Sequence, residues 1–164
     1  MSRTKLILLG TGTPNAEPWA SGPAVAVTVD DKAYLVDFGA GVVRQCTKAS
    51  SMGIEQLNPR NLTVAFCTHL HSDHTTGLAD LIFTPWVLTR NEPLKIYGPK
   101  GMKHMVDCIS DAYKVDVDFR LHGDEQGNEN GYKTDVTEIY NGYVYKDDLV
   151  TVEAFTALHG TLEC

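Results

Sequence analysis

No stretch of this 164-residue sequence is apolar over anything near the roughly 20 residues that a membrane-spanning helix needs. The N-terminal apolar segment, residues 6–9, is too short for the hydrophobic region of a signal peptide, and no small-residue cleavage site follows it. We therefore expect no membrane partner, and we interpret this segment as part of a first β-strand.

Cysteine is scarce and widely spaced. The four cysteines form no C-x-x-C motif, and none has the spacing of a metal ligand. This pattern excludes a disulfide framework and is typical of reduced thiols. We therefore predict a cytoplasmic location.

The sequence also lacks a cluster of basic residues. Its formal net charge is −7, and residues 81–164 contribute −6 of it. Nucleic-acid-binding proteins usually carry a basic patch or stripe. The charge therefore argues against RNA as a partner without excluding it, and it is compatible with a small-molecule or nucleotide ester.

The length and composition predict one globular domain over residues 1–164. Hydrophobic residues make up 43% of the chain and charged residues 21%, which is ordinary for a globular protein. The apolar patterns predict strands at 5–9, 24–29, 33–37, 61–68 and 94–97, and helices over 42–46, 78–85 and 102–109. The second of these helices is expected to end at Pro85.

Further along, the patterns are those of strands. Residues 115–121 alternate apolar with polar, which predicts a strand. Residues 132–139 and 149–158 predict two strands paired across a turn near residue 141. Between these regions, residues 123–131 are polar and glycine-rich and are expected to form a loop.

The chemistry is concentrated in one short segment, T-H-L-H-S-D-H. It contains His69, His71, Asp73 and His74. His69 and His71 are two residues apart, so they project to the same side at the end of a strand. Imidazoles and a carboxylate are typical ligands of zinc, and the pattern therefore predicts a metal site rather than a polar turn. His159 also ends a predicted strand and is a candidate third ligand. The two other histidines of the sequence are not expected to bind the metal: His104 is interpreted as a solvated surface residue and His122 as an ion-pair partner of nearby acidic residues.

These motifs resemble the metallo-β-lactamase superfamily. The H-x-H-x-D-H motif is matched in full, and L-G-T-G-T-P, L-V-D-F-G and I-Y-G-P-K-G are similar to segments of its ribonuclease Z branch. The resemblance implies an α/β fold, an αββα sandwich with a two-metal hydrolytic site at one edge. It also implies the residue roles: His69, His71 and His159 on a first zinc, and Asp73 and His74 on a second. Asp37 would orient a ligand histidine, its alternative role being that of a strand-end cap.

Part of the family pattern is not found. The family continues past its third histidine motif to an aspartate in a G-D-S/T turn and a last histidine, whereas this sequence stops five residues after His159. We therefore expect a fold that is truncated after the third motif, or one completed by another chain. Such a fold leaves a sheet edge or face uncovered, which predicts a homo-oligomer, in the simplest case a dimer.

The resemblance implies a zinc-dependent hydrolase that cleaves a phosphodiester or related ester with a metal-activated water, Asp73 positioning that water as general base. Two zinc ions would occupy a complete site. Iron or manganese accept the same ligands, so an iron-binding redox enzyme or a non-catalytic binding protein of the same fold is the alternative.

Overall fold

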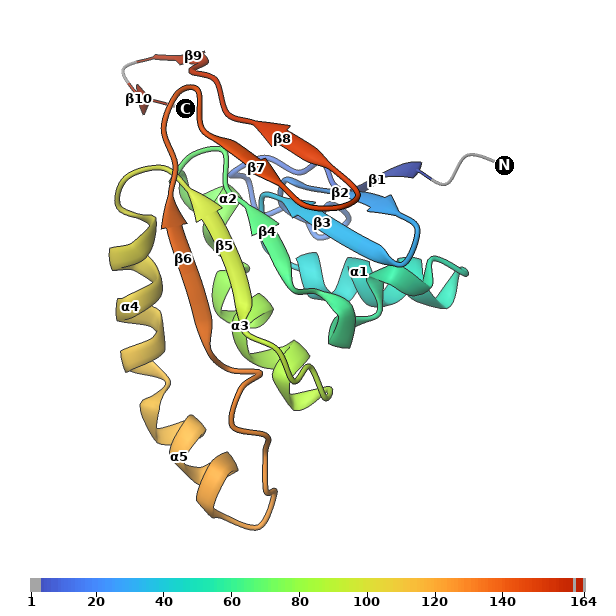
Figure 1. The fold of residues 1–164 in the computed structure, drawn as a ribbon, viewed down its shortest axis with the longest axis vertical. Coiled ribbons are helices and arrows are strands. Elements are labelled where there is room, and N and C mark those ends of the chain that lie inside the picture. The colour runs from blue at the N-terminus through green and yellow to red at the C-terminus, as the bar shows by residue number, and fades with distance from the viewer. Residues whose placement is uncertain (1–3, 161, 164) are drawn as a thin grey trace.

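The computed structural model describes residues 4–160 together with residues 162 and 163. In this part of the chain a six-stranded sheet has its strands in sequence order, from β1 at one edge to β6 at the other (Figure 1). The strands β1, β2 and β3 pair antiparallel, whereas β3 to β6 pair in parallel. The strands are β1 (Thr4–Gly10), β2 (Ala24–Val29), β3 (Lys32–Val36), β4 (Val64–Phe66), β5 (Leu94–Gly98) and β6 (Thr134–Glu138).

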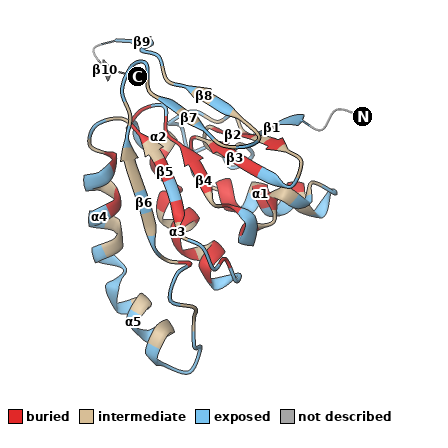
Figure 2. Cartoon of the chain, in the orientation of Figure 1, coloured by how far each residue is buried: buried red, intermediate tan, exposed pale blue. Residues whose placement is uncertain are grey.

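Helices cover one face of this sheet. The main ones are α1 (Val42–Ser51), α3 (Leu78–Val87) and α4 (Met102–Ala112), and each turns an apolar stripe toward the strands. The side chains between helices and sheet form the larger core, coloured red in Figure 2. The strands predicted over residues 5–9, 24–29, 33–37, 61–68 and 94–97 correspond to β1 to β5. The helices predicted over 42–46, 78–85 and 102–109 correspond to α1, α3 and α4. No helix among the described residues is both long and apolar enough to cross a membrane.

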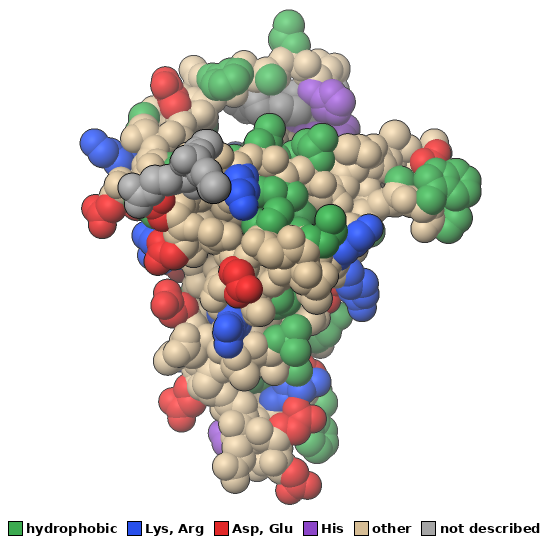
Figure 3. Space-filling model, turned by 90° about the vertical axis from the view of Figure 1, so that its right-hand side faces the viewer, with side chains coloured by type: hydrophobic (Ala, Val, Ile, Leu, Met, Phe, Trp, Pro, Cys, Tyr) green, Lys and Arg blue, Asp and Glu red, His purple; other side chains and the backbone are tan. Residues whose placement is uncertain are grey.

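The opposite face of the sheet is covered only in part. A hairpin of β7 (Val144–Lys146) and β8 (Thr151–Glu153) lies over it and packs on Tyr34, Val64 and Phe66. Beyond the hairpin, Leu6 and Leu8 of the edge strand expose 70% and 67% of their surface. Hydrophobic side chains gather in the middle of this side of the molecule (Figure 3). Within the part of the chain that the structure describes, the sheet therefore keeps an apolar area open at its β1 edge.

The predicted strand over residues 115–121 is wrong, because these residues form helix α5 (Lys114–His122). Val117 and Leu121 are four residues apart and pack on the core, whereas Val115 and Phe119 are exposed. The polar residues between them carried the helical signal: Arg120 bonds Asp116, and His122 bonds Asp118, both at the i,i+4 spacing. An alternation of apolar residues fitted a strand, but the charge pairs fit only a helix.

The pairing of the last strands differs from the prediction as well. β6 pairs with β5 in parallel, with Leu94 opposite Thr134, and β8 pairs with β7 across a turn at residues 147–150. The helices α4 and α5 provide the long crossover that a parallel neighbour requires. Two apolar segments on either side of an Asn-Gly turn therefore do not pair with each other here.

Helix α3 does not end at Pro85 as predicted but continues to Val87. A proline inside a helix lacks the N–H that would bond to the carbonyl four residues earlier, here that of Leu81. Arg90 replaces this donor, with its Nη1 3.0 Å from the Leu81 carbonyl oxygen. The helix therefore passes the proline without leaving that carbonyl unpaired.

Candidate metal centre

The predicted site residues collect where parallel strands end. Strand β3 ends at Val36, directly before Asp37, and β4 ends at Phe66, three residues before His69. β3 and β4 are parallel neighbours, so their carboxyl ends meet at one edge of the sheet. After His71 the chain enters the short helix α2 (Ser72–Thr75), which turns Asp73 and His74 back toward the strand ends.

Three imidazoles converge at this edge. His71 Nδ1 lies 3.0 Å from His69 Nε2 and 3.2 Å from His159 Nε2. Two nitrogen ligands of a tetrahedral zinc are about 3.3 Å apart, given Zn–N distances near 2.0–2.1 Å. His69, His71 and His159 are the one group of three potential ligands that share a single small volume among the described residues. The donor type and spacing both fit a zinc ion.

A second pair lies beside the triad. His74 Nε2 is 3.7 Å from Asp73 Oδ2, and the His74 ring centroid lies 4.2 Å from that of His69. Both side chains are partly buried. This pair offers two ligand atoms next to the first position, fewer than a zinc ion requires.

Asp37 is buried against this cluster, with 7% of its surface exposed. Its Oδ2 accepts a hydrogen bond from His74 Nδ1 at 2.8 Å, and its Oδ1 accepts from the Thr68 amide at 2.8 Å. The backbone at Asp37 has φ of 60°, an uncommon value for a residue other than glycine, so the conformation is held by these contacts.

Thr68 extends the same network, and sequence reasoning missed it. Its hydroxyl donates to the Asp37 carboxylate at 2.9 Å and lies 2.9 Å from His69 Nδ1. Because a carboxylate only accepts, the hydroxyl proton points to Asp37 and its lone pair faces the Nδ1–H of His69. The Nε2 atoms of His69 and His74 are then left free to bind a metal. A threonine directly before the histidine motif was the available signal.

Electrostatics also favour the neutral form of His69. Burial, followed by repulsion from His74 and His71, lowers the pKa of His69 below its ordinary value. A neutral imidazole has the lone pair that metal binding requires. Cys67 is close in sequence but is not a ligand, because its Sγ–H bonds to the His69 carbonyl at 3.0 Å.

Glycines allow the two site loops to touch. The Phe38 amide donates to the His74 carbonyl at 3.0 Å, which holds the segment after β3 against α2. A Cβ at Gly39 would lie 2.5 Å from the Asp73 carbonyl oxygen, and one at Gly77 would lie 2.4 Å from the Gly39 carbonyl oxygen. Only glycine fits at these two positions, and their close approach brings Asp37 within reach of His74.

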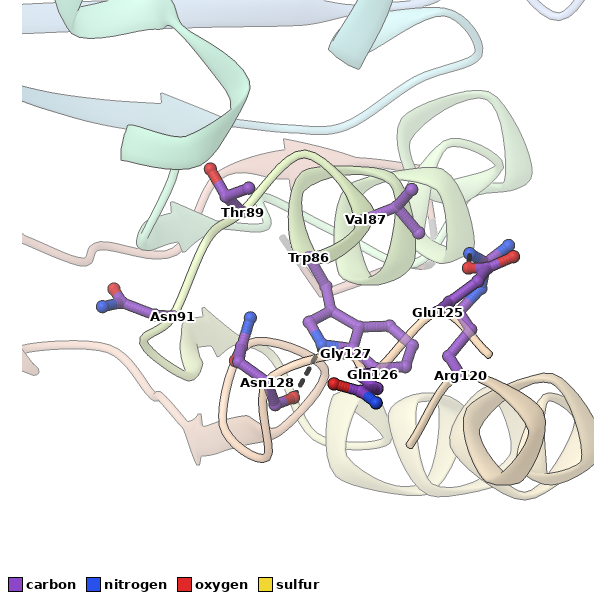
Figure 4. Close-up of a pocket in the computed structure, with 9 residues that line it drawn as sticks. All are labelled: Trp86, Val87, Thr89, Asn91, Arg120, Glu125, Gln126, Gly127 and Asn128. Atoms are coloured by element: carbon purple, nitrogen blue, oxygen red, sulfur yellow. Dashed lines mark hydrogen bonds and ion pairs between the residues drawn. The ribbon is translucent and has the colours of Figure 1, made fainter. Parts of the chain in front are cut away.

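The remaining candidates lie elsewhere. His104 is exposed on α4, and His122 pairs with Asp118 at 3.0 Å, as interpreted from the sequence. An open pocket between α3, α5 and the loop at residues 125–128 is lined by Trp86 and Arg120, and none of the predicted site residues faces it (Figure 4). Arg120 is already paired with Asp116 and Glu125 there.

A mixed sheet backed by helices, with a histidine-rich motif at the carboxyl ends of its parallel strands, defines an α/β protein with a candidate metal centre. A family model of the metallo-beta-lactamase superfamily matches residues 18–134. The chain belongs to this superfamily, and the predicted fold class is confirmed.

Within the superfamily the chain is similar to ribonuclease Z. It is 31% identical over 160 residues to ribonuclease Z of Mycobacterium marinum, covering 94% of this chain and 54% of that protein. The crystal structure of human tRNase Z, short form, matches with a TM-score of 0.73 at 25% identity, over 96% of this chain and 62% of that one. A metallo-beta-lactamase fold protein of Bacillus subtilis, at 16% identity and a TM-score of 0.68, shares the fold. The chain thus spans about half the length of the curated relatives it matches.

Proposed function

We propose that this protein is a zinc-dependent hydrolase that cleaves phosphodiester bonds in RNA. The observation that carries this proposal is the triad of imidazole nitrogens 3.0 and 3.2 Å apart. The similarity to ribonuclease Z supports the choice of an RNA phosphodiester, although the acidic composition gives no basic patch for RNA.

The roles of the residues follow from their contacts. His69, His71 and His159 would hold a zinc ion, which when bound supplies a Lewis acid and lowers the pKa of a water molecule. Asp73 lies beside the triad and would accept a proton from the attacking water as general base, and with His74 it would contribute to a second metal position. Asp37 and Thr68 would orient the histidines.

Zinc counting tests the proposal. We expect the 164-residue chain to bind one zinc ion tightly, because the triad provides three ligands and the Asp73–His74 pair only two. Native mass spectrometry after dialysis against zinc gives the count, and hydrolysis of bis-p-nitrophenyl phosphate and of a transfer RNA is measured with and without zinc. Two tightly bound ions, tightly bound iron in place of zinc, or zinc binding that survives the loss of His71 would each contradict the proposed site.

We further propose that the protein acts in the cytoplasm and associates with itself, as a dimer. Cys46, Cys67 and Cys108 are free thiols, and free thiols are typical of proteins in a reducing compartment such as the cytoplasm. Exposed Leu6 and Leu8 leave an apolar area on an edge strand that a second copy would cover. Sedimentation velocity is expected to show a dimer that Leu8→Lys converts to monomer, with Val115→Lys, a change of an equally exposed residue on α5, as the control. A monomer at all concentrations would contradict this.

A further inference from the structure

His159 reaches the metal centre from a part of the chain that is weakly attached to the main sheet. It lies in the two-residue strand β9 (Leu158–His159), which is fully on the surface. β9 pairs only with β10 (Leu162–Glu163) among the described residues, in a small sheet of its own. Its position therefore depends on the β7–β8 hairpin that precedes it.

The segment between β8 and His159 is tied to residues 141 and 142, which lead from β6 into that hairpin. The Thr156 amide donates to Asn141 Oδ1 at 3.1 Å, and Gly142 N donates to the Ala154 carbonyl at 2.8 Å. Figure 1 shows the hairpin running across the sheet and continuing directly into β9. Any movement of the hairpin would consequently carry His159 with it.

Besides its apolar packing on Val64 and Phe66, the hairpin is joined to the sheet by one carboxylate. Asp147, at the hairpin turn, accepts a hydrogen bond at Oδ2 from the Tyr34 hydroxyl of β3 at 2.7 Å, and lies 3.5 Å from Lys32 Nζ. The same carboxylate shapes the turn, because its Oδ1 accepts from the amides of Leu149 and Val150 at 2.8 and 2.9 Å. The Tyr145 hydroxyl of the hairpin also donates to Oδ2, at 3.0 Å.

The surroundings make this link firm. Tyr34 exposes 3% of its surface and belongs to the cluster formed with Phe66 and Tyr145. Burial alone raises the pKa of Asp147, but the hydrogen bonds from Tyr34, the two amides and Tyr145 outweigh it and hold that pKa well below its usual range. Asp147 is thus charged at neutral pH, and hydrogen bonds to a charged acceptor are the stronger kind. Strand β3, which binds the hairpin through Tyr34, ends at Val36, directly before Asp37.

We propose that Asp147 is a positioning residue for His159: by binding Tyr34 it seats the β7–β8 hairpin on the sheet and so delivers the third histidine to His71. The inference rests on the proposed metal centre. Binding a metal through three residues is favourable when their arrangement exists beforehand, because less conformational freedom is then lost. Without the hydrogen bond between Asp147 and Tyr34, His69 and His71 stay at the strand end, whereas His159 is no longer held beside His71.

Two tyrosine substitutions separate this role from general stability. Tyr34→Phe removes the hydrogen bond from the sheet to Asp147 and leaves only the longer contact with Lys32, at 3.5 Å. Tyr145→Phe removes a hydrogen bond to the same carboxylate from within the hairpin. We expect Tyr34→Phe to weaken zinc affinity about tenfold, as for residues that orient a ligand. Tyr145→Phe is expected to change it by less than about threefold. Asp147→Ala should weaken zinc affinity at least as much as Tyr34→Phe, and Asp147→Asn should recover part of the loss.

Zinc affinity is measured by competition with a chromophoric chelator, and cobalt replaces zinc in a second measurement. Loss of His159 as a ligand weakens the visible absorption of tetrahedral cobalt in Tyr34→Phe and Asp147→Ala. Hydrogen exchange without metal should accelerate in residues 142–159 in these two variants and stay unchanged in β3 and β4. Faster exchange throughout the chain would indicate general destabilisation and overturn the proposal.

His159→Ala makes the two possible failures distinguishable. If it leaves zinc affinity unchanged, the proposed metal centre fails, and the positioning role fails with it. If His159→Ala weakens binding but Tyr34→Phe and Tyr145→Phe behave alike, the metal centre stands and the role of Asp147 is overturned.

Discussion

Replacing Asp73 with alanine is expected to slow zinc-dependent hydrolysis of bis-p-nitrophenyl phosphate by about 10²–10⁴-fold, the usual contribution of a general base. The Asp73 carboxylate lies 3.7 Å from His74 Nε2, beside the histidine triad but outside it. Its removal takes away a proton acceptor and leaves all three imidazoles in place. The variant should therefore still bind one zinc ion but hydrolyse the phosphodiester much more slowly.

His104→Ala is the matched control, since His104 is an exposed histidine on α4 outside the site. Its rate and zinc content should equal those of the unmodified protein. Asp73→Asn keeps the shape of the side chain without the basic oxygen and should be nearly as slow as Asp73→Ala. Equal rates for Asp73→Ala and His104→Ala would show that the catalytic role is assigned to the wrong residue.

Replacing Arg90 with alanine is expected to lower the free energy of unfolding by about 3–5 kcal/mol, because buried acceptors lose their donors and a cavity remains. Arg90 is fully buried, and its guanidinium donates to the carbonyls of Leu62, Leu81, Ile82 and Gly131 at 2.6 to 3.2 Å. Burial lowers the pKa of Arg90 to about 10, so the group stays charged at neutral pH. It joins α3, the segment before β4 and the loop before β6.

Urea unfolding followed by circular dichroism measures the effect. Arg90→Met fills most of the side-chain volume but provides no hydrogen-bond donors. It should still show most of the loss in unfolding free energy expected for Arg90→Ala, which separates the effect of hydrogen bonding from that of packing. The control is Arg44→Ala, whose ion pair with Asp80 at 2.8 Å lies on the surface, and its cost should be within about 1 kcal/mol. A loss from Arg90→Ala no larger than that of Arg44→Ala would contradict the structural role.

Local patterns were sufficient for much of the fold. The alternation in residues 24–29 and 33–37 around a short polar turn identified β2 and β3, because hairpin pairing is set by neighbours in the sequence. The stripe of Met102, Met105 and Val106 identified α4 for a similar reason, since a helix repeats within one short segment. In α5 the apolar residues fit both the two-residue period of a strand and the spacing of a helix, and their alternation led to the wrong prediction of a strand.

The proposed metal-binding motif could be found from the sequence alone, because His69, His71, Asp73 and His74 stand within six residues and their chemistry does not depend on distant contacts. Only the tertiary structure decided what surrounds it. Thr68 between Asp37 and His69, and Tyr34 on Asp147 113 positions away, are ordinary polar residues in the sequence. A hydrogen bond between segments far apart leaves no local pattern, and neither does a buried arginine whose partners are all backbone carbonyls, such as Arg90. Chain segments had to be brought together in three dimensions before these residues acquired their roles.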